Sequence, residues 1–220
     1  MKSATWPNRR APEESAWRPS SEQQDPPRLE AAAAVLAEAF ADDPVLAEFR
    51  PPRPGEDRPA VLIGLFAALI RSVPMPARRV DVATIGDRVV GAAFWQAPGR
   101  QPGGVRAFVR QVPAFLRALG LGGALRAVAH LRRMERARPA TPHWYLAEIG
   151  VSASARGRGI GGLLLGHALE RADRTSAGAY LESSTPVNRR LYRRHGFTDG
   201  APIAGFRAAA PIGMWRPAAG

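Results

Sequence analysis

The chain has 220 residues, a length typical of a single domain that buries its own hydrophobic core. It contains no cysteine, which excludes a disulfide scaffold, a thiolate metal site and a cysteine nucleophile. The 31 Lys and Arg residues outnumber the 19 Asp and Glu residues, so the formal net charge is +12. Such an excess suits a polyanion, but the arginines are spread along the whole chain. We therefore expect solvated surface charge rather than a nucleic-acid partner.

The sequence shows neither a basic-then-apolar leader nor an uninterrupted apolar run of about 18–20 residues. Its longest apolar segment, residues 60–70, contains Gly64 and is followed by Arg71. We expect a soluble cytoplasmic protein that does not bind a membrane.

Residues 1–27 are rich in Pro, Ser, Arg, Glu and Gln. Such a segment buries too little apolar surface to offset the entropy lost on ordering, so we predict a disordered arm. Only residues 16–18 and 21–24 resemble strands within it. The single folded domain is then expected to span residues 28–220.

Apolar periodicity predicts two helices and then two strands in the first half of the domain. The first helix ends at Asp42-Asp43-Pro44, because the residue before a proline disfavours helical geometry. A tight turn at Gly86-Asp87 joins the strands into a hairpin. The helices are residues 28–41 and 56–73, and the strands are residues 79–85 and 88–96.

A long helical segment leads into an alternation of strands and helices. Residues 103–138 have a helical pattern that Pro113 and the glycines of 120–123 interrupt, which predicts two short helices or a bent pair. The order strand, helix, strand, helix then indicates an α/β fold. These elements are residues 144–151, 160–174, 179–182 and 186–195, with one or two closing strands between 197 and 215.

The glycine-rich loop after the strand 144–151 has the physical features of an anion site. Glycines let a ligand approach the backbone, and the first turn of the next helix offers free N–H groups. Two arginines add positive charge. The loop comprises Arg156, Gly157, Arg158, Gly159, Ile160, Gly161 and Gly162.

Two known phosphate motifs fit this loop poorly. A dinucleotide fingerprint needs Gly-x-Gly-x-x-Gly, whereas the order here is Gly-Arg-Gly-Ile-Gly-Gly. A Walker A loop needs Gly-Lys followed by Ser or Thr, which is absent. A glycine corner that only allows tight packing of helix on strand remains an alternative.

Two motifs resemble those of the GNAT N-acetyltransferase superfamily. Arg156, Gly159 and Gly161 fill its acyl-CoA loop pattern, Gln/Arg-x-x-Gly-x-Gly/Ala. The segment from Asn188 through Tyr192 to Phe197 resembles its Asn-x-x-x-Tyr-x-x-x-Gly-Phe pattern. Within the superfamily, residues 36–44, 143–151 and 180–197 are similar to puromycin N-acetyltransferases and their actinobacterial relatives.

The resemblance implies a central twisted sheet that is mixed and mostly antiparallel, flanked by helices, with a splayed strand pair at the acyl-CoA site. It also implies acetyl-CoA as co-substrate. Ile149, Gly150 and Val151 would hold the pantetheine and the thioester carbonyl, and loop 156–162 the pyrophosphate. The first strand of the family is expected just before residue 28, where this sequence is a poor strand former. Because His130 and His195 are isolated along the sequence, we expect no metal site.

The same resemblance gives two residues near residue 190 a role. Tyr192 would protonate the departing CoA thiolate, or it is a core tyrosine bonded to the backbone. Asn188 would contact the pantetheine or cap its helix.

Two carboxylates are candidates for the general base. Glu148 lies in an apolar strand, where an acidic residue is costly unless it is paired or functional. Glu182 ends the next strand, where related acetyltransferases use a carboxylate. We assign Glu148 to substrate contact and Glu182 to water-mediated deprotonation. The alternative for each is a purely structural carboxylate that pairs with an arginine.

The sequence therefore predicts an enzyme that acetylates a primary amine of a small molecule, such as an antibiotic or aminonucleoside, as a monomer or homodimer. A protein or peptide N-acetyltransferase and a non-catalytic acyl-CoA-binding regulatory protein are the alternatives. A closed acceptor pocket favours a small molecule, whereas an open groove favours a peptide.

Overall fold

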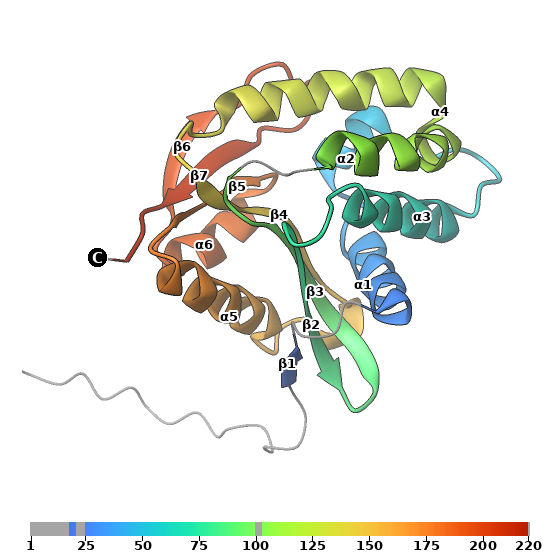
Figure 1. Cartoon of the computed structure of the whole chain (residues 1–220). Helices are drawn as coiled ribbons and strands as arrows, with labels where there is room; N and C mark the ends of the chain where they lie inside the picture. The colour runs from blue at the N-terminus through green and yellow to red at the C-terminus, as the bar shows by residue number, and fades with distance from the viewer. Residues whose placement is uncertain (1–17, 21–24, 100–102, 220) are drawn as a thin grey trace, which may run out of the picture.

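A single seven-stranded sheet forms the centre of the described part of the molecule (Figure 1). The computed structural model describes residues 18–20, 25–99 and 103–219. The strand order is β1-β2-β3-β4-β5-β7-β6, and neighbours are antiparallel except for β4 and β5, which are parallel. The strands are β1 (Arg18–Ser20), β2 (Arg78–Ile85), β3 (Arg88–Gln96), β4 (His143–Val151), β5 (Gly178–Ser183), β6 (Thr198–Pro202) and β7 (Ile212–Arg216). The predicted mixed, mostly antiparallel α/β sheet is confirmed.

Helices cover both faces of this sheet (Figure 1). The first face carries α1 (Pro26–Ala39), α2 (Pro44–Phe49), α3 (Arg58–Arg71) and α4 (Gly104–Ala137). The other face carries α5 (Ile160–Arg174) and α6 (Pro186–Arg194). Each face has its own hydrophobic cluster, because side chains alternate between the two faces along every strand.

Three of the helices on the first face begin in the same way, with an aspartate followed by a proline in the first turn. Asp25, Asp43 and Asp57 each accept a hydrogen bond from a backbone N–H of the helix that follows. From the sequence, Asp43-Pro44 is expected only to end α1. In the structure the same two residues also begin α2, whose six residues are too few to show a helical period.

Part of the predicted arm carries regular structure. Arg18–Ser20 pairs with β2 at the sheet edge, and α1 begins at Pro26 rather than at residue 28. The remaining arm residues, 1–17 and 21–24, lie outside the described residues.

The predicted bend between residues 103 and 138 is confirmed in α4. Gly120 has non-helical angles (φ 68°, ψ 169°), whereas Pro113 stays within the helix. Glycine adopts a positive φ at little cost, so the bend falls there. Among the described residues, α4 is also the one helix long and apolar enough to cross a membrane by length and composition. This property is not apparent from the sequence, because Pro113 and the glycines of 120–123 interrupt the helical pattern.

A buried ion pair fixes α5 to the sheet. The guanidinium of Arg171 donates to both carboxylate oxygens of Asp81 on β2, at 3.0 and 2.8 Å. Asp81 is 0% exposed, and the guanidinium also lies 5.0 Å from the ring centroid of Trp144 on β4. The bidentate geometry is the form in which a buried ion pair is best compensated.

Replacing Asp81 with Ala should lower the free energy of unfolding by about 3–5 kcal/mol, since it leaves the Arg171 charge buried without its partner. Denaturant unfolding would measure the change. The matched control is Asp199→Ala, which breaks an exposed bidentate pair with Arg193 and should leave the unfolding midpoint nearly unchanged. Equal effects of the two substitutions would contradict this account.

Candidate active site

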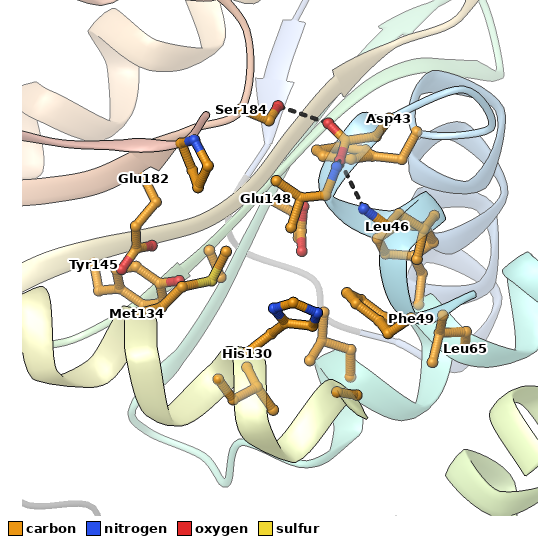
Figure 2. Close-up of a pocket in the computed structure, with 18 of the residues that line it drawn as sticks. Asp43, Leu46, Phe49, Leu65, His130, Met134, Tyr145, Glu148, Glu182 and Ser184 are labelled. Carbon is orange, nitrogen blue, oxygen red and sulfur yellow. Dashed lines mark hydrogen bonds between the residues drawn. The ribbon is translucent and has the colours of Figure 1, made fainter. Parts of the chain in front are cut away.

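A cavity of about 360 Å³ lies on the α4 side of the sheet, and it is lined by residues of α2, α3, α4 and α6, by the strands β4 and β5, and by Phe40, which follows α1 (Figure 2). Apolar side chains from α2, α3 and α4 form most of its wall. The polar side chains that line it are Asp43, Gln96, His130, Arg138, Tyr145, Glu148, Glu182, Ser184, Asn188 and Tyr192. The cavity therefore unites an apolar chamber with a group of ionisable residues.

The strands β4 and β5 separate at this cavity. Their pairing runs only from His143–Gly178 to Leu146–Leu181, although β4 continues to Val151 and β5 to Ser183. The predicted splayed pair is thus confirmed. Beyond Leu146 the edge of β4 that faces β5 has backbone groups without a strand partner, which makes it a place for an extended ligand to bind.

A bulge at Ala147 directs Glu148 into the cavity. Phe94 pairs with Glu148 and Trp95 with Leu146, so Ala147 is left unpaired. Before the bulge Leu146 packs in the α5-side cluster, and after it Ile149 packs there too. Glu148 consequently lies on the α4 side, where regular alternation would have put it on the α5 side.

Glu148 is a carboxyl group in a weakly solvated place. Burial raises its pKa well above the ordinary value of 4.5, and the carboxylates of Asp43 and Glu182 raise it further. It forms no ion pair within the part of the chain that the structure describes. A carboxylate in this state is a suitable general base near neutral pH.

Glu182 has the arginine partner that Glu148 lacks. Its side chain is 5% exposed, and Arg138 Nε donates to its Oε1 at 3.3 Å. The same guanidinium lies 3.6 Å from the ring centroid of Tyr145. The side chains of Tyr145 and Glu182 lie next to each other (Figure 2). Burial raises the pKa of Glu182, while Arg138 and Tyr145 oppose that rise. The alternative that a carboxylate pairs with an arginine is therefore correct for Glu182.

Asp43 joins the two sides of the cavity, a role that sequence reasoning missed. Its Oδ1 accepts from the backbone N–H groups of Val45 and Leu46, and its Oδ2 accepts from Ser184 Oγ at 2.6 Å (Figure 2). Ser184 immediately follows β5, so the bond spans from the start of α2 to the splayed strand. The Asp-Pro pair was the signal for the cap, but nothing local indicated Ser184.

A second junction closes the cavity near β6 and β7. Glu48 Oε1 accepts from three successive backbone N–H groups, those of Arg207, Ala208 and Ala209, at 2.7–3.0 Å. Its other oxygen lies 3.7 Å from Nε2 of His130 on α4, and burial lowers the pKa of that histidine. The loop between β6 and β7 is thereby attached to α2 and α4, and its Pro211 lines the cavity.

Tyr192 lies on α6 at the wall of the cavity. It is buried and packs edge-on against Phe197, with ring centroids 6.1 Å apart. Burial raises the pKa of its phenol, as do Glu148 and Asp43, so the hydroxyl keeps its proton throughout the neutral range. Tyr192 belongs to the hydrophobic core and lines the cavity as well.

Asn188 does not cap α6. The N-cap is Thr185, whose side chain accepts from the backbone N–H of Asn188 at 3.4 Å. The capping alternative for Asn188 is therefore wrong, because the cap lies three residues earlier. Asn188 lines the cavity instead.

The glycine-rich loop has the conformation of an anion site rather than of a packing corner. Gly157 and Gly159 have φ of 77° and 79°, and a Cβ on either would meet nothing within 4 Å. Their positive φ, not close packing, requires glycine there. No described side chain caps α5, and Arg156 and Arg158 are exposed beside its first turn. These residues fit a pyrophosphate group.

Gly150 has a different reason for being glycine. A Cβ there would lie 2.6 Å from the Cβ of Ala39, so α1 could not approach β4 as closely. Ile149 and Val151 flank it on the part of β4 that no longer pairs with β5, and Arg156 Nε donates to the Val151 carbonyl at 3.4 Å. The predicted pantetheine segment thus lies at the splay, with Gly150 serving the packing of α1.

No group of His, Asp and Glu side chains in the described residues could hold a metal ion.

Comparison with known proteins supports the same interpretation. Residues 82–197 match the model of the acetyltransferase (GNAT) family. A structure described as histone acetyltransferase HPA2 and related acetyltransferase, from Corynebacterium glutamicum, is 29% identical with a TM-score of 0.70. The alignment covers 93% of this chain and 97% of that one.

Two further solved structures share the fold at lower identity. Arylalkylamine N-acetyltransferase 2 from Aedes aegypti is 15% identical with a TM-score of 0.57, over 91% of this chain and 98% of that chain. The NatC complex bound to Gag peptide and CoA is 11% identical with a TM-score of 0.55, over 93% of this chain and 99% of that chain. Because one is named for an arylalkylamine and the other holds a peptide, the fold does not decide the acceptor.

Replacing Glu148 with Gln should stabilise the protein above pH 4.5. The unfolded chain releases this proton near pH 4.5, whereas the folded protein retains it to higher pH, so the free energy of unfolding falls as pH rises toward the raised pKa. Gln removes that decline. Denaturant unfolding at pH 4.5 and 7.5 should show a gain for the variant that is larger at pH 7.5.

The control for this prediction is Glu135→Gln, which alters an exposed carboxylate on α4. It should change stability little at either pH. A gain from Glu148→Gln that is the same at both pH values would argue against a raised pKa.

Proposed function

Because the chain belongs to the GNAT family of acetyltransferases, we propose that it transfers an acetyl group from acetyl-CoA to a primary amine of a small molecule by direct attack. The observation that carries this proposal is the meeting of Glu148 and Tyr192 in one cavity at the splay of β4 and β5. One is a carboxyl group of raised pKa and the other a protonated phenol.

The chain's own groups suffice for the proton transfers of such a reaction. Glu148, directly or through one water, accepts the proton of the substrate ammonium. The neutral amine nitrogen then forms a bond to the thioester carbonyl carbon, and the carbon–sulfur bond breaks. Tyr192 donates a proton to the departing thiolate, and the proton lost by the amide nitrogen returns to solvent. The absence of cysteine fits direct transfer, since a cysteine-bound acetyl intermediate is excluded.

The residues proposed to hold acetyl-CoA form a continuous path. The thioester and pantetheine would lie along Ile149, Gly150 and Val151, where β4 no longer pairs with β5, and Asn188 of α6 lines the same cavity. The pyrophosphate would bind the uncapped first turn of α5. The loop residues for it are Arg156, Gly157, Arg158, Gly159, Ile160, Gly161 and Gly162.

The roles of the two carboxylates change with the tertiary contacts. We now propose Glu148 as the base, because it has no ion-pair partner among the described residues. Glu182 is a positioning residue, since Arg138 and Tyr145 fix its carboxylate and it raises the pKa of Glu148. The expectation that Glu182 removes the proton is thereby replaced.

The shape of the cavity favours a small acceptor over a peptide. Helix α4 covers it, the Asp43–Ser184 bond crosses one side, and the Glu48 junction closes another. An extended peptide needs an open groove. The resemblance to puromycin N-acetyltransferases makes an aminonucleoside or other antibiotic amine a first acceptor to test. A purely regulatory acyl-CoA-binding protein would not need Glu148 and Tyr192 in these positions.

Thiol release from acetyl-CoA with a panel of primary amines tests the reaction. Glu148→Gln should lower kcat/KM about 10²–10³-fold at neutral pH, because it removes the base, whereas Glu182→Gln should lower it less than tenfold. The wild-type pH profile should rise through an apparent pKa above 4.5, and the Glu148→Gln profile should lose that limb. Unimpaired rates in both variants would end the carboxylate-base proposal.

Replacing Tyr192 with Phe should lower kcat about 10²-fold while the KM for acetyl-CoA stays within threefold, since only the hydroxyl is lost. The control is Tyr180→Phe, because the Tyr180 hydroxyl is buried beside Gly213 and does not line the cavity. An unchanged kcat in Tyr192→Phe would assign Tyr192 to the core alone.

A further inference from the structure

The acceptor cavity is strongly asymmetric in its chemistry. Its ionisable groups gather where β4 and β5 separate, around Glu148 and Asp43 (Figure 2). Away from that end the wall is mostly hydrocarbon, for example Phe49 of α2 and Leu65 of α3, with the ring of His130 of α4 placed beside Phe49 (Figure 2). A ligand that fills the cavity must therefore be charged at one end and apolar over the rest.

The charge at the polar end favours a cation. Arg138 neutralises Glu182, and His130 is paired with Glu48. Glu148 and Asp43 remain, and the donors that bond to the Asp43 carboxylate within the described residues are all neutral. An ammonium group is the kind of ligand charge that suits these carboxylates.

The hydrocarbon wall continues outward to the protein surface along α4. Phe108, Leu116, Val128 and Leu131 all line the cavity, yet each is 41–45% exposed. We call these four residues the α4 mouth. Large apolar side chains with this exposure leave hydrocarbon in contact with water, and an apolar ligand that passes between them would bury it.

We propose that the acceptor is an amphiphilic primary amine, with one ammonium group at Glu148 and a hydrocarbon tail that runs through the chamber toward the α4 mouth. This inference rests on the proposed function and names its substrate class. A second ammonium group or several hydroxyls on the tail would lose their hydration without finding partners in this wall. Polyamines and amino sugars are accordingly poor acceptors.

The first test measures binding and turnover of unbranched alkylamines from ethylamine to octylamine. Dissociation constants from calorimetry, with CoA present, should fall about fourfold for each added methylene until the chamber is filled. The value of kcat/KM in the thiol-release assay should rise in parallel, and putrescine should bind more weakly than butylamine.

Because binding is measured separately, failure of this inference differs from failure of the proposed function. Affinity that rises with tail length without any turnover would support the amphiphilic site but refute the acetyltransferase proposal. Turnover with affinities that stay flat or fall as the tail lengthens would overturn the inference and leave the acetyltransferase proposal standing.

The second test uses matched leucines on α4. Leu116→Gln puts a polar group in the mouth and should weaken octylamine binding about tenfold, while ethylamine binding stays within twofold. The control, Leu121→Gln, changes a leucine that is 72% exposed and does not line the cavity, so both affinities should be unchanged. Since both side chains are exposed, neither substitution should unfold the protein, which circular dichroism checks. Equal effects of the two substitutions on octylamine would overturn the proposed path of the tail.

Discussion

The loss of pairing between β4 and β5 after Leu146 is the constraint on which the rest of this molecule depends. A continuous sheet would satisfy its own backbone groups and leave no room for a ligand between the strands. Here the parallel pair separates, and the two helix layers come within reach of each other through the gap. Tyr192 of α6 can therefore line a cavity whose other wall is made by α2, α3 and α4. The bulge at Ala147 acts with the splay, because it turns Glu148 toward that cavity.

The electrostatics of the site follow from how unequally two carboxylates are compensated. Both lie in surroundings that raise their pKa, but only Glu182 has an arginine and a tyrosine to stabilise its charged form. An uncompensated Glu148 lowers stability at neutral pH, which is typical of a functional position. The pair of Arg171 with the fully buried Asp81 shows the opposite case, in which the fold uses an ion pair only to join α5 to the sheet.

Glycines near the site serve two different physical purposes. Gly150 leaves space for Ala39, and this contact brings α1 against β4. Gly157 and Gly159 have empty surroundings and are needed for their left-handed backbone, which presents the start of α5 without a side-chain cap. The sequence shows all three simply as glycine, so their purposes become distinct only when neighbouring elements are in place.

The sequence by itself determined the order and boundaries of most elements, the hairpin at Gly86-Asp87, the glycine loop before α5 and the two motifs around Arg156 and Tyr192. These features depend on periodicity and on backbone preferences within a few residues. It did not determine the bulge that turns Glu148, the Arg138–Glu182 pair across 44 residues, the Asp43–Ser184 bond across 141, or the hydrocarbon mouth on α4. Only the tertiary structure decided these, because each depends on which distant side chains share one poorly solvated space, and no local pattern encodes that proximity.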